Sequence, residues 1–183
     1  MKKIIVLMFL LTVTAFSESV EAYIDYNFAD DYSFKNGETL NKSGSDLGLS
    51  LEIYDPVEDN LKVGWGLSQI RGKVDIAGSH KVNLTTAYFA GKYYLSGKEG
   101  TGFFFKFQGG GYLNRSILGK TSVSGLDLDN GYYYSYGIGG EMSNFILQFM
   151  YNSYIGNATI NGNSTKLDYG TGTLSFGYLF DLK

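Results

Sequence analysis

The stretch TLSFGYLFDL, residues 173–182, alternates large apolar side chains with mostly small or polar ones. One face of this segment, when extended, carries only large apolar side chains: Leu174, Phe176, Tyr178, Phe180 and Leu182. Strict alternation with a period of two residues predicts a β-strand with one apolar face. The direction in which that face points separates a water-soluble protein from one that spans a membrane.

Seven other stretches show the same alternation, and each is close to the length that a tilted strand needs to cross a bilayer. They run through residues 20–28, 47–53, 61–67, 82–90, 103–113, 132–142 and 145–151. In the fourth of these stretches we assign the apolar face to Val82, Leu84, Thr86, Tyr88 and Ala90. The sequence therefore predicts eight strands.

The predicted connections between these strands alternate in length. The connections after the first, third, fifth and seventh strands are long and polar, at residues 29–45, 69–81, 115–129 and 156–166. The others are short, and Met142-Ser143-Asn144-Phe145 predicts a two-residue hairpin. On that register Ile138 faces Phe149 and Tyr136 faces Tyr151. An even number of strands, with long loops at one end and short turns at the other, is typical of bacterial outer-membrane barrels.

The apolar faces are predicted to point outward. The interior of an eight-stranded barrel is only wide enough for side chains to fill it or for one small ligand, so it has no room for all the large apolar side chains. No helical segment of the predicted barrel domain is available to cover them either. We therefore predict an all-β fold, an eight-stranded antiparallel up-and-down transmembrane β-barrel. A water-soluble, lipocalin-like barrel is the alternative.

The N-terminal segment has a different composition. Lys2 and Lys3 precede the apolar run Ile4 to Leu11, and Ala15-Phe16-Ser17 supplies the small residues that a signal peptidase reads. This pattern predicts a signal peptide at residues 1–17 and one barrel domain at residues 18–183. The chain contains no cysteine, which excludes disulfides and a lipoprotein attachment site.

The charge balance argues against nucleic acid as a partner. Removal of the signal peptide takes away two lysines and leaves 13 basic residues against 18 acidic ones, a net charge of −5. Metal-ligand spacings and phosphate-binding glycine loops are absent from the sequence, so we predict no metal and no cofactor.

Together, the signal segment, the eight strands and the aromatic last strand resemble the OmpA/OmpX-type family of small outer-membrane barrels. The resemblance implies a monomer in the bacterial outer membrane, in contact with outer-membrane lipids and lipopolysaccharide. It also implies a C-terminal signal for the barrel assembly machinery, on Leu174, Phe176, Gly177, Tyr178 and Phe180. Many members end on an aromatic residue, whereas Asp181-Leu182-Lys183 follow Phe180 here.

Several charged residues have the parity of the inward face: Glu21, Asp25, Glu52, Lys62, Lys106 and Glu141. Because buried charges need partners, we predict an interior ion-pair cluster of Glu21, Glu52, Lys62, Lys106 and Glu141. A turn at Asp55 to Asn60 sets Glu52 opposite Lys62, and Lys106 falls diagonal to Glu141. OmpA-type barrels hold a similar network, and this one is either a structural plug or a gate.

The function predicted from these features is structural or surface-interacting (adhesion-like), through four extracellular loops. The alternative is a narrow channel for small solutes or lipophiles. A lipid-modifying enzyme is the third candidate, and it would depend on His80, the only histidine, which lies beside Ser79 in a predicted loop. Catalysis needs both groups fixed and oriented, which adjacent loop residues rarely achieve. Trp65, Tyr88 and Tyr178 are predicted members of the aromatic girdles at the membrane surfaces.

Overall fold

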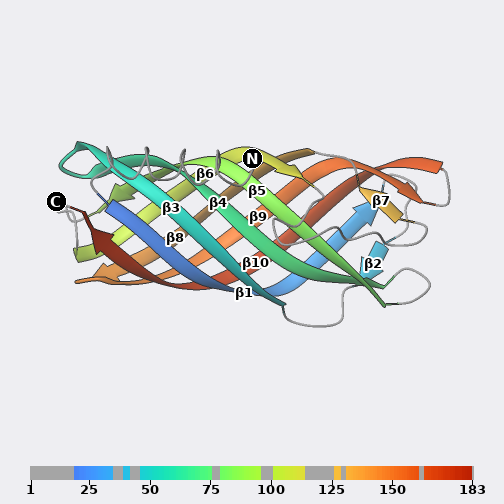
Figure 1. Ribbon diagram of the computed structural model, residues 1–183, viewed down its shortest axis with the longest axis horizontal. Coiled ribbons are helices and arrows are strands. Elements are labelled where there is room, and N and C mark those ends of the chain that lie inside the picture. Colours follow the sequence, from blue (N-terminus) through green and yellow to red (C-terminus); the bar gives the residue numbers. More distant parts are fainter. Residues whose placement is uncertain are drawn as a thin grey trace, which may run out of the picture.

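The computed structural model describes residues 19–34, 39–41, 46–75, 79–95, 101–113, 126–128, 131–160 and 163–182. Eight long strands cross the molecule (Figure 1): β1 (Ser19–Phe34), β3 (Asp46–Glu58), β4 (Leu61–Asp75), β5 (Ser79–Tyr94), β6 (Thr101–Leu113), β8 (Gly131–Met142), β9 (Phe145–Ile160) and β10 (Asn163–Asp181). Two strands of three residues, β2 (Thr39–Asn41) and β7 (Leu126–Leu128), pair with β1 and β9. The predicted signal peptide lies outside the described residues, so its cleavage stays a prediction.

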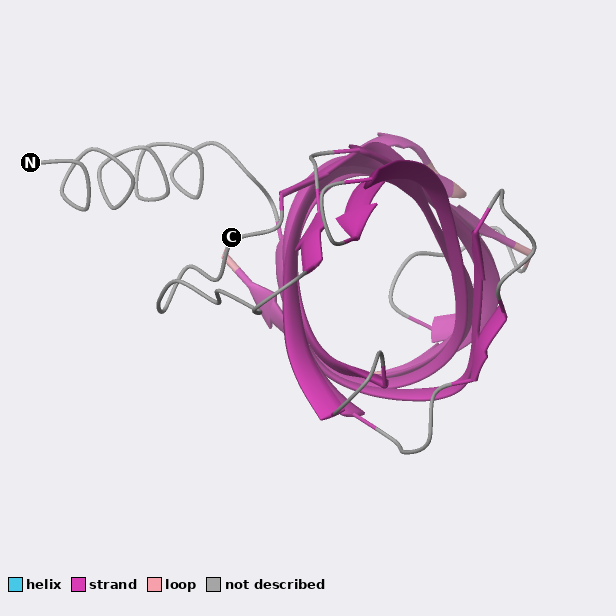
Figure 2. Cartoon of the chain, turned by 90° about the vertical axis from the view of Figure 1, so that its right-hand side faces the viewer, coloured by secondary structure: helices cyan, strands magenta, loops and turns pink. Residues whose placement is uncertain are grey.

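The long strands close into a barrel. Each pairs antiparallel with the next long strand in the chain, and β10 pairs with both β9 and β1. Figure 2, a view turned by 90° from Figure 1, shows the resulting ring of strands around one lumen. The predicted eight-stranded antiparallel barrel is therefore confirmed. The described residues include no helix long and apolar enough to cross a membrane.

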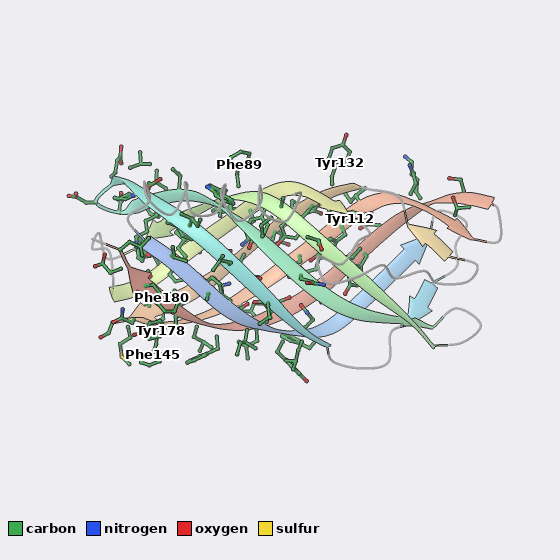
Figure 3. All side chains as sticks on the ribbon, in the orientation of Figure 1. Phe89, Tyr112, Tyr132, Phe145, Tyr178 and Phe180 are labelled. Atoms are coloured by element: carbon green, nitrogen blue, oxygen red, sulfur yellow. The ribbon has the colours of Figure 1, made fainter. Side chains whose placement is uncertain are left out.

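Side chains alternate between the outside of the barrel and its lumen. On β8, Tyr132 is 78% exposed, whereas the next residue, Tyr133, is 5% exposed. Figure 3 shows Tyr132 and Phe89 pointing away from the strands. Large apolar side chains cover the outside on every long strand, among them Ile24, Leu49, Val63, Phe107, Ile138, Phe149 and Phe176. A water-soluble protein buries such residues, so this surface is that of a barrel surrounded by lipid.

The hairpin between β8 and β9 has the predicted register. Met142 pairs with Phe145, Ile138 with Phe149 and Tyr136 with Tyr151. The rings of the last pair are 5.5 Å apart, a stabilising distance for aromatic side chains. The turn uses Ser143, whose φ of 57° lies in the left-handed region that two-residue hairpins need.

The predicted apolar face of β5 was wrong. Tyr88 is 5% exposed and faces the lumen with Leu84 and Ala90, whereas Phe89 is 78% exposed and faces outward. Both faces of this strand carry large apolar residues, so alternation alone could not separate them. The neighbouring strand decides the face, because Phe89 pairs with the outward-facing Trp65 on β4. Tyr88 therefore does not belong to an aromatic girdle.

Three of the predicted long loops contain much strand. The loop predicted at residues 29–45 includes the end of β1, up to Phe34, and all of β2. The ladder between β4 and β5 runs to the pair Asp75 and Ser79, which places most of residues 69–81 in the sheet. The ladder between β9 and β10 runs to the pair Ile160 and Asn163, which does the same for residues 156–166. These strands therefore extend further than predicted toward the end of the barrel opposite the two described chain ends (Figure 1).

Candidate functional site

The lumen contains seven buried charged residues among the described ones: Glu21, Asp25, Glu52, Lys62, Lys92, Lys106 and Glu141. Six of them have the inward parity read from the sequence. Lys92 was missed because the faces of β5 were exchanged in the prediction. With the correct face, Lys92 follows Tyr88 and Ala90 on the inward side of β5 and would have been found by parity alone.

Glu52 accepts hydrogen bonds from four side chains, two on each carboxylate oxygen. Oε2 accepts from Lys106 Nζ at 2.6 Å and from Tyr54 OH at 3.0 Å. Oε1 accepts from Gln108 Nε2 at 2.7 Å and from Tyr88 OH at 2.8 Å. This carboxylate is completely buried, and its hydrogen-bonding capacity is filled.

A second ion pair joins Glu21 and Lys92. Lys92 Nζ lies 2.7 Å from Oε1 and 2.5 Å from Oε2 of Glu21, and the hydroxyl of Tyr23 also donates to this carboxylate. The Oε2 of Glu141 lies 4.0 Å from the same ammonium and accepts a hydrogen bond of 2.7 Å from Tyr94. Lys92 therefore lies between two carboxylates.

Residues of like charge stand side by side on the wall of the barrel. Lys62 pairs with Lys92 across β4 and β5, and Lys92 pairs with Lys106 across β5 and β6. Glu21 and Glu52 are direct neighbours across β1 and β3. Like charges directly opposite each other destabilise a sheet, so their compensation must come from elsewhere. The two close ion pairs supply it across the lumen, with two strands between the partners in each case.

The predicted pairing of Glu52 with Lys62 was wrong. Glu52 pairs with Gly66, whereas Lys62 pairs with Pro56. The physical reason is the turn, which is tight at Asp59 and Asn60 and follows a register shift between Pro56 and Glu58. The ammonium of Lys62 lies 5.6 Å from the centre of the Tyr94 ring.

The predicted diagonal contact of Lys106 with Glu141 was also wrong. Glu141 pairs with Gly102 and Lys106 pairs with Gly137, so the two residues are four positions apart along the ladder. Lys106 instead bonds Glu52 across the lumen and donates to Gln148 Oε1 at 3.0 Å.

A hydrogen-bonded chain extends from Glu52 toward the other side of the lumen. Gln108 donates to Glu52, and the hydroxyl of Tyr133 lies 2.6 Å from Gln108 Oε1 and 2.9 Å from Asn152 Oδ1. Asn152 donates to Thr173 at 2.6 Å, and Thr173 donates to Asn27 at 2.6 Å. Beside this chain lies a cavity of about 20 Å³, which is room for a water-sized particle.

Aromatic rings fill the lumen above the charged residues. Tyr133 packs against Tyr88 at 5.5 Å and against Tyr154 at 5.1 Å between ring centroids. Tyr154 in turn contacts Tyr112 at 5.7 Å and Tyr169 at 5.3 Å. The last three rings are almost completely buried. The described part of the lumen is thus filled by ion pairs, amides and tyrosines.

The residues of the predicted C-terminal assembly signal lie on β10. Leu174, Phe176, Tyr178 and Phe180 point outward, and Gly177 lies on the lumen side, where a Cβ would come within 2.4 Å of Tyr23. Figure 3 shows Tyr178 and Phe180 beside Phe145 near the C-terminal end of the barrel. Their recognition by an assembly machinery stays a prediction.

His80 lies in β5, opposite Val74, and not in a loop as predicted. Ser79 and His80 are consecutive residues of an extended strand. The described residues contain no group of three or more side chains suited to hold a metal ion.

No family model and no curated protein matches this chain. Solved structures do match it. Neisserial surface protein A is 14% identical over 90% of this chain and 98% of its own, with a TM-score of 0.56. The attachment invasion locus protein Ail of Yersinia pestis, in complex with the heparin analogue sucrose octasulfate, is 15% identical over 88% and 98%, with a TM-score of 0.54. The outer membrane protein OprG of Pseudomonas aeruginosa is 13% identical over 90% and 97%, with a TM-score of 0.51. The chain therefore has the fold of the small eight-stranded outer-membrane barrels.

Proposed function

We propose that this chain is a bacterial outer-membrane protein whose closed barrel is an anchor, and that it acts at the cell surface in an adhesion-like role. The apolar outside of the barrel supports the membrane location. Aromatic contacts at the end of the barrel that holds the short turns, such as Phe145 with Tyr178 at 5.5 Å, are typical of a membrane interface. We propose that this apolar outside contacts the outer-membrane lipids and lipopolysaccharide.

The observation that carries this proposal is the filled lumen. Two close ion pairs connect opposite walls, and stacked tyrosines fill the space beyond them. The cavity beside Glu52 has a volume of about 20 Å³, which is room for one water-sized particle. We therefore assign the charged cluster the role of a plug that holds the barrel together. We place the adhesion-like activity at the extracellular end of the barrel.

The similar structures support the same assignment. Ail carries attachment and invasion in its name and binds a heparin analogue, and the Neisserial protein is named as a surface protein. In a barrel with a blocked lumen, the connections beyond the membrane are the parts available for such contacts. The barrel assembly machinery and outer-membrane lipids are the other proposed partners, and the proposed state is a monomer.

Two measurements test the proposal. In planar bilayers, the refolded wild-type chain should show no steady channels. Bacteria that express it should adhere to host-cell monolayers more than bacteria without it, and replacement of residues 114–125 by a Gly-Ser linker should reduce adherence at equal surface amounts. Steady channels of the wild type would contradict the plug, and equal adherence of all strains would contradict the surface role.

The second candidate is a gated narrow channel, and one observation favours it. Lys92 lies within ion-pair distance of both Glu21 and Glu141, so a second arrangement of the cluster is within reach of one side chain. If the cluster is a gate, Lys92→Met should open steady channels that the wild type lacks. If it is a plug alone, the same variant should lose stability without gaining conductance.

The third candidate, a lipid-modifying enzyme, would depend on His80. A lipid deacylation or acyl-transfer assay that compares the wild-type chain with His80→Ala tests it directly. Activity that is lost in the variant would replace the surface-interaction proposal.

A further inference from the structure

Asp25 is a buried carboxylate that forms no close ion pair with a described residue, and Lys106 attracts it only from beyond ion-pair distance. It lies on β1, is 5% exposed, and accepts a hydrogen bond from the hydroxyl of Ser50 on β3. Ser175, directly opposite on β10, is a second hydroxyl partner. Among the described residues, no lysine lies within ion-pair distance of Asp25. Two neutral hydroxyls hydrogen-bond this carboxylate but do not neutralise its charge.

The charges of the described lumen do not balance. Glu21, Asp25, Glu52 and Glu141 are four carboxylates, whereas Lys62, Lys92 and Lys106 are three ammonium groups. Two of these lysines are engaged by glutamates, Lys106 by Glu52 and Lys92 by Glu21 and Glu141. One excess negative charge therefore remains when all seven groups are ionised. An uncompensated charge inside a closed barrel is costly, so the site favours a positive partner.

The cavity of about 20 Å³ lies next to Asp25. Its wall includes the carboxylates of Asp25 and Glu52 together with the hydroxyls of Ser50, Ser68 and Ser175. Of the side chains that line it, only Met150 lacks an oxygen or nitrogen atom. A space of this size holds one water-sized particle. It is therefore both large enough for a small ion and surrounded by oxygen atoms.

We propose that this cavity binds one monovalent alkali cation, with Asp25 as its charged ligand and the neighbouring serine hydroxyls as neutral ligands. Hard cations take carboxylate, hydroxyl and carbonyl oxygens as ligands. The single excess charge of the described part of the lumen matches one monovalent ion. The ion completes the charge balance of the plug without opening the lumen, and this site does not depend on the proposed surface role.

The test measures whether sodium stabilises the folded barrel. The full chain, refolded in detergent, is unfolded in urea at increasing sodium chloride, with choline chloride added to keep the ionic strength constant. A ligand that binds only the folded state lowers the unfolding equilibrium constant in proportion to its concentration once it exceeds the dissociation constant. We therefore expect up to a tenfold decrease for each tenfold increase in sodium above that value. Asp25→Asn should lose this dependence.

The exposed Asp168 on β10 provides a matched control, and Asp168→Asn should keep the sodium dependence of the wild type. If Asp25→Asn does not refold, Ser175→Ala retains the charge and removes one ligand, so it should need more sodium for the same stabilisation. The relaxation of ²³Na in the presence of the wild-type protein is a second measurement that requires no variant.

Two results would overturn the site. Equal stability of the wild-type chain in sodium and choline, with unchanged ²³Na relaxation, would mean that Asp25 is neutralised by a proton. A sodium dependence that persists in full in Asp25→Asn or Ser175→Ala would place the ion elsewhere.

Discussion

The ion pair between Lys106 and Glu52 gives the sharpest prediction for the stability of this barrel. Both side chains are completely buried, and Nζ lies 2.6 Å from Oε2. At that distance and an effective dielectric constant of about 20, the attraction is on the order of 6 kcal/mol, most of which offsets the loss of hydration. The net contribution of the ion pair to the free energy of unfolding is thus far smaller than the loss expected when only one of its two partners is removed.

Removal of one partner leaves the other charged and buried. Lys106→Met leaves Glu52 with three neutral donors, Tyr54, Tyr88 and Gln108, and Glu52→Gln leaves Lys106 with Gln148. Each single change should reduce the free energy of unfolding by about 3–5 kcal/mol. The double variant leaves no orphan charge from this pair, and we expect it to fall short of the sum of the single effects by about 2 kcal/mol.

The assay is a double-mutant cycle from urea unfolding in detergent, followed by the fluorescence of Trp65, the only tryptophan of the chain. A parallel cycle of Glu52→Gln with Lys62→Met is the control. Glu52 forms its ion pair with Lys106, whereas Lys62 lies opposite Pro56 in the ladder, four positions from Glu52. Its coupling should stay below about 1 kcal/mol. Coupling below about 0.5 kcal/mol for Glu52 and Lys106, or stronger coupling for Glu52 and Lys62, would refute the observed register.

Three further predictions concern the wall of the barrel. Gly110→Ala should cost about 1–3 kcal/mol, because its Cβ would lie 2.1 Å from the carbonyl oxygen of Ala87, whereas Gly109→Ala, with nothing within 4 Å, should change the unfolding free energy by less than about 0.5 kcal/mol. Phe149→Arg on the lipid face should cost about 2–4 kcal/mol near the bilayer midplane, and Gln148→Asn in the lumen should cost less, both measured by unfolding in lipid bilayers. The refolded chain should show β-type circular dichroism and migrate differently on gels before and after heating, and a folded monomer in water without detergent would contradict the lipid-facing exterior.

The strand pattern could be predicted from the sequence wherever the two faces differ in kind. On β8 and β9, large apolar residues alternate with small or polar ones, and the register set by Ser143 and Asn144 is the observed one. On β5 both faces carry large residues, and the pair of Phe89 with Trp65 on the neighbouring strand decides the direction. Alternation within one strand contains no information on such a neighbour.

The inward parity of the charged residues could also be predicted, but their partners could not. Parity requires only that a strand be identified, whereas a pair requires the register of each turn. β3 continues to Glu58 and the turn is confined to Asp59 and Asn60, which places Lys62 opposite Pro56 instead of Glu52, and no local rule for the Asp55 to Asn60 segment gives that register. Contacts across the lumen add a further difficulty, because Lys106 and Glu52 lie on strands that are not neighbours.

The arrangement of these charges ties their compensation to closure of the barrel. In the flat sheet, Lys62, Lys92 and Lys106 would be direct neighbours, as would Glu21 and Glu52, and each set would repel itself. Only a closed barrel brings the lysine-bearing strands β5 and β6 to face β1 and β3 at the distances observed. The same residues that weaken an open sheet therefore stabilise the ring. This explains why charged side chains occupy a lumen that apolar ones would fill at lower cost: they favour the closed barrel over other arrangements of the same strands.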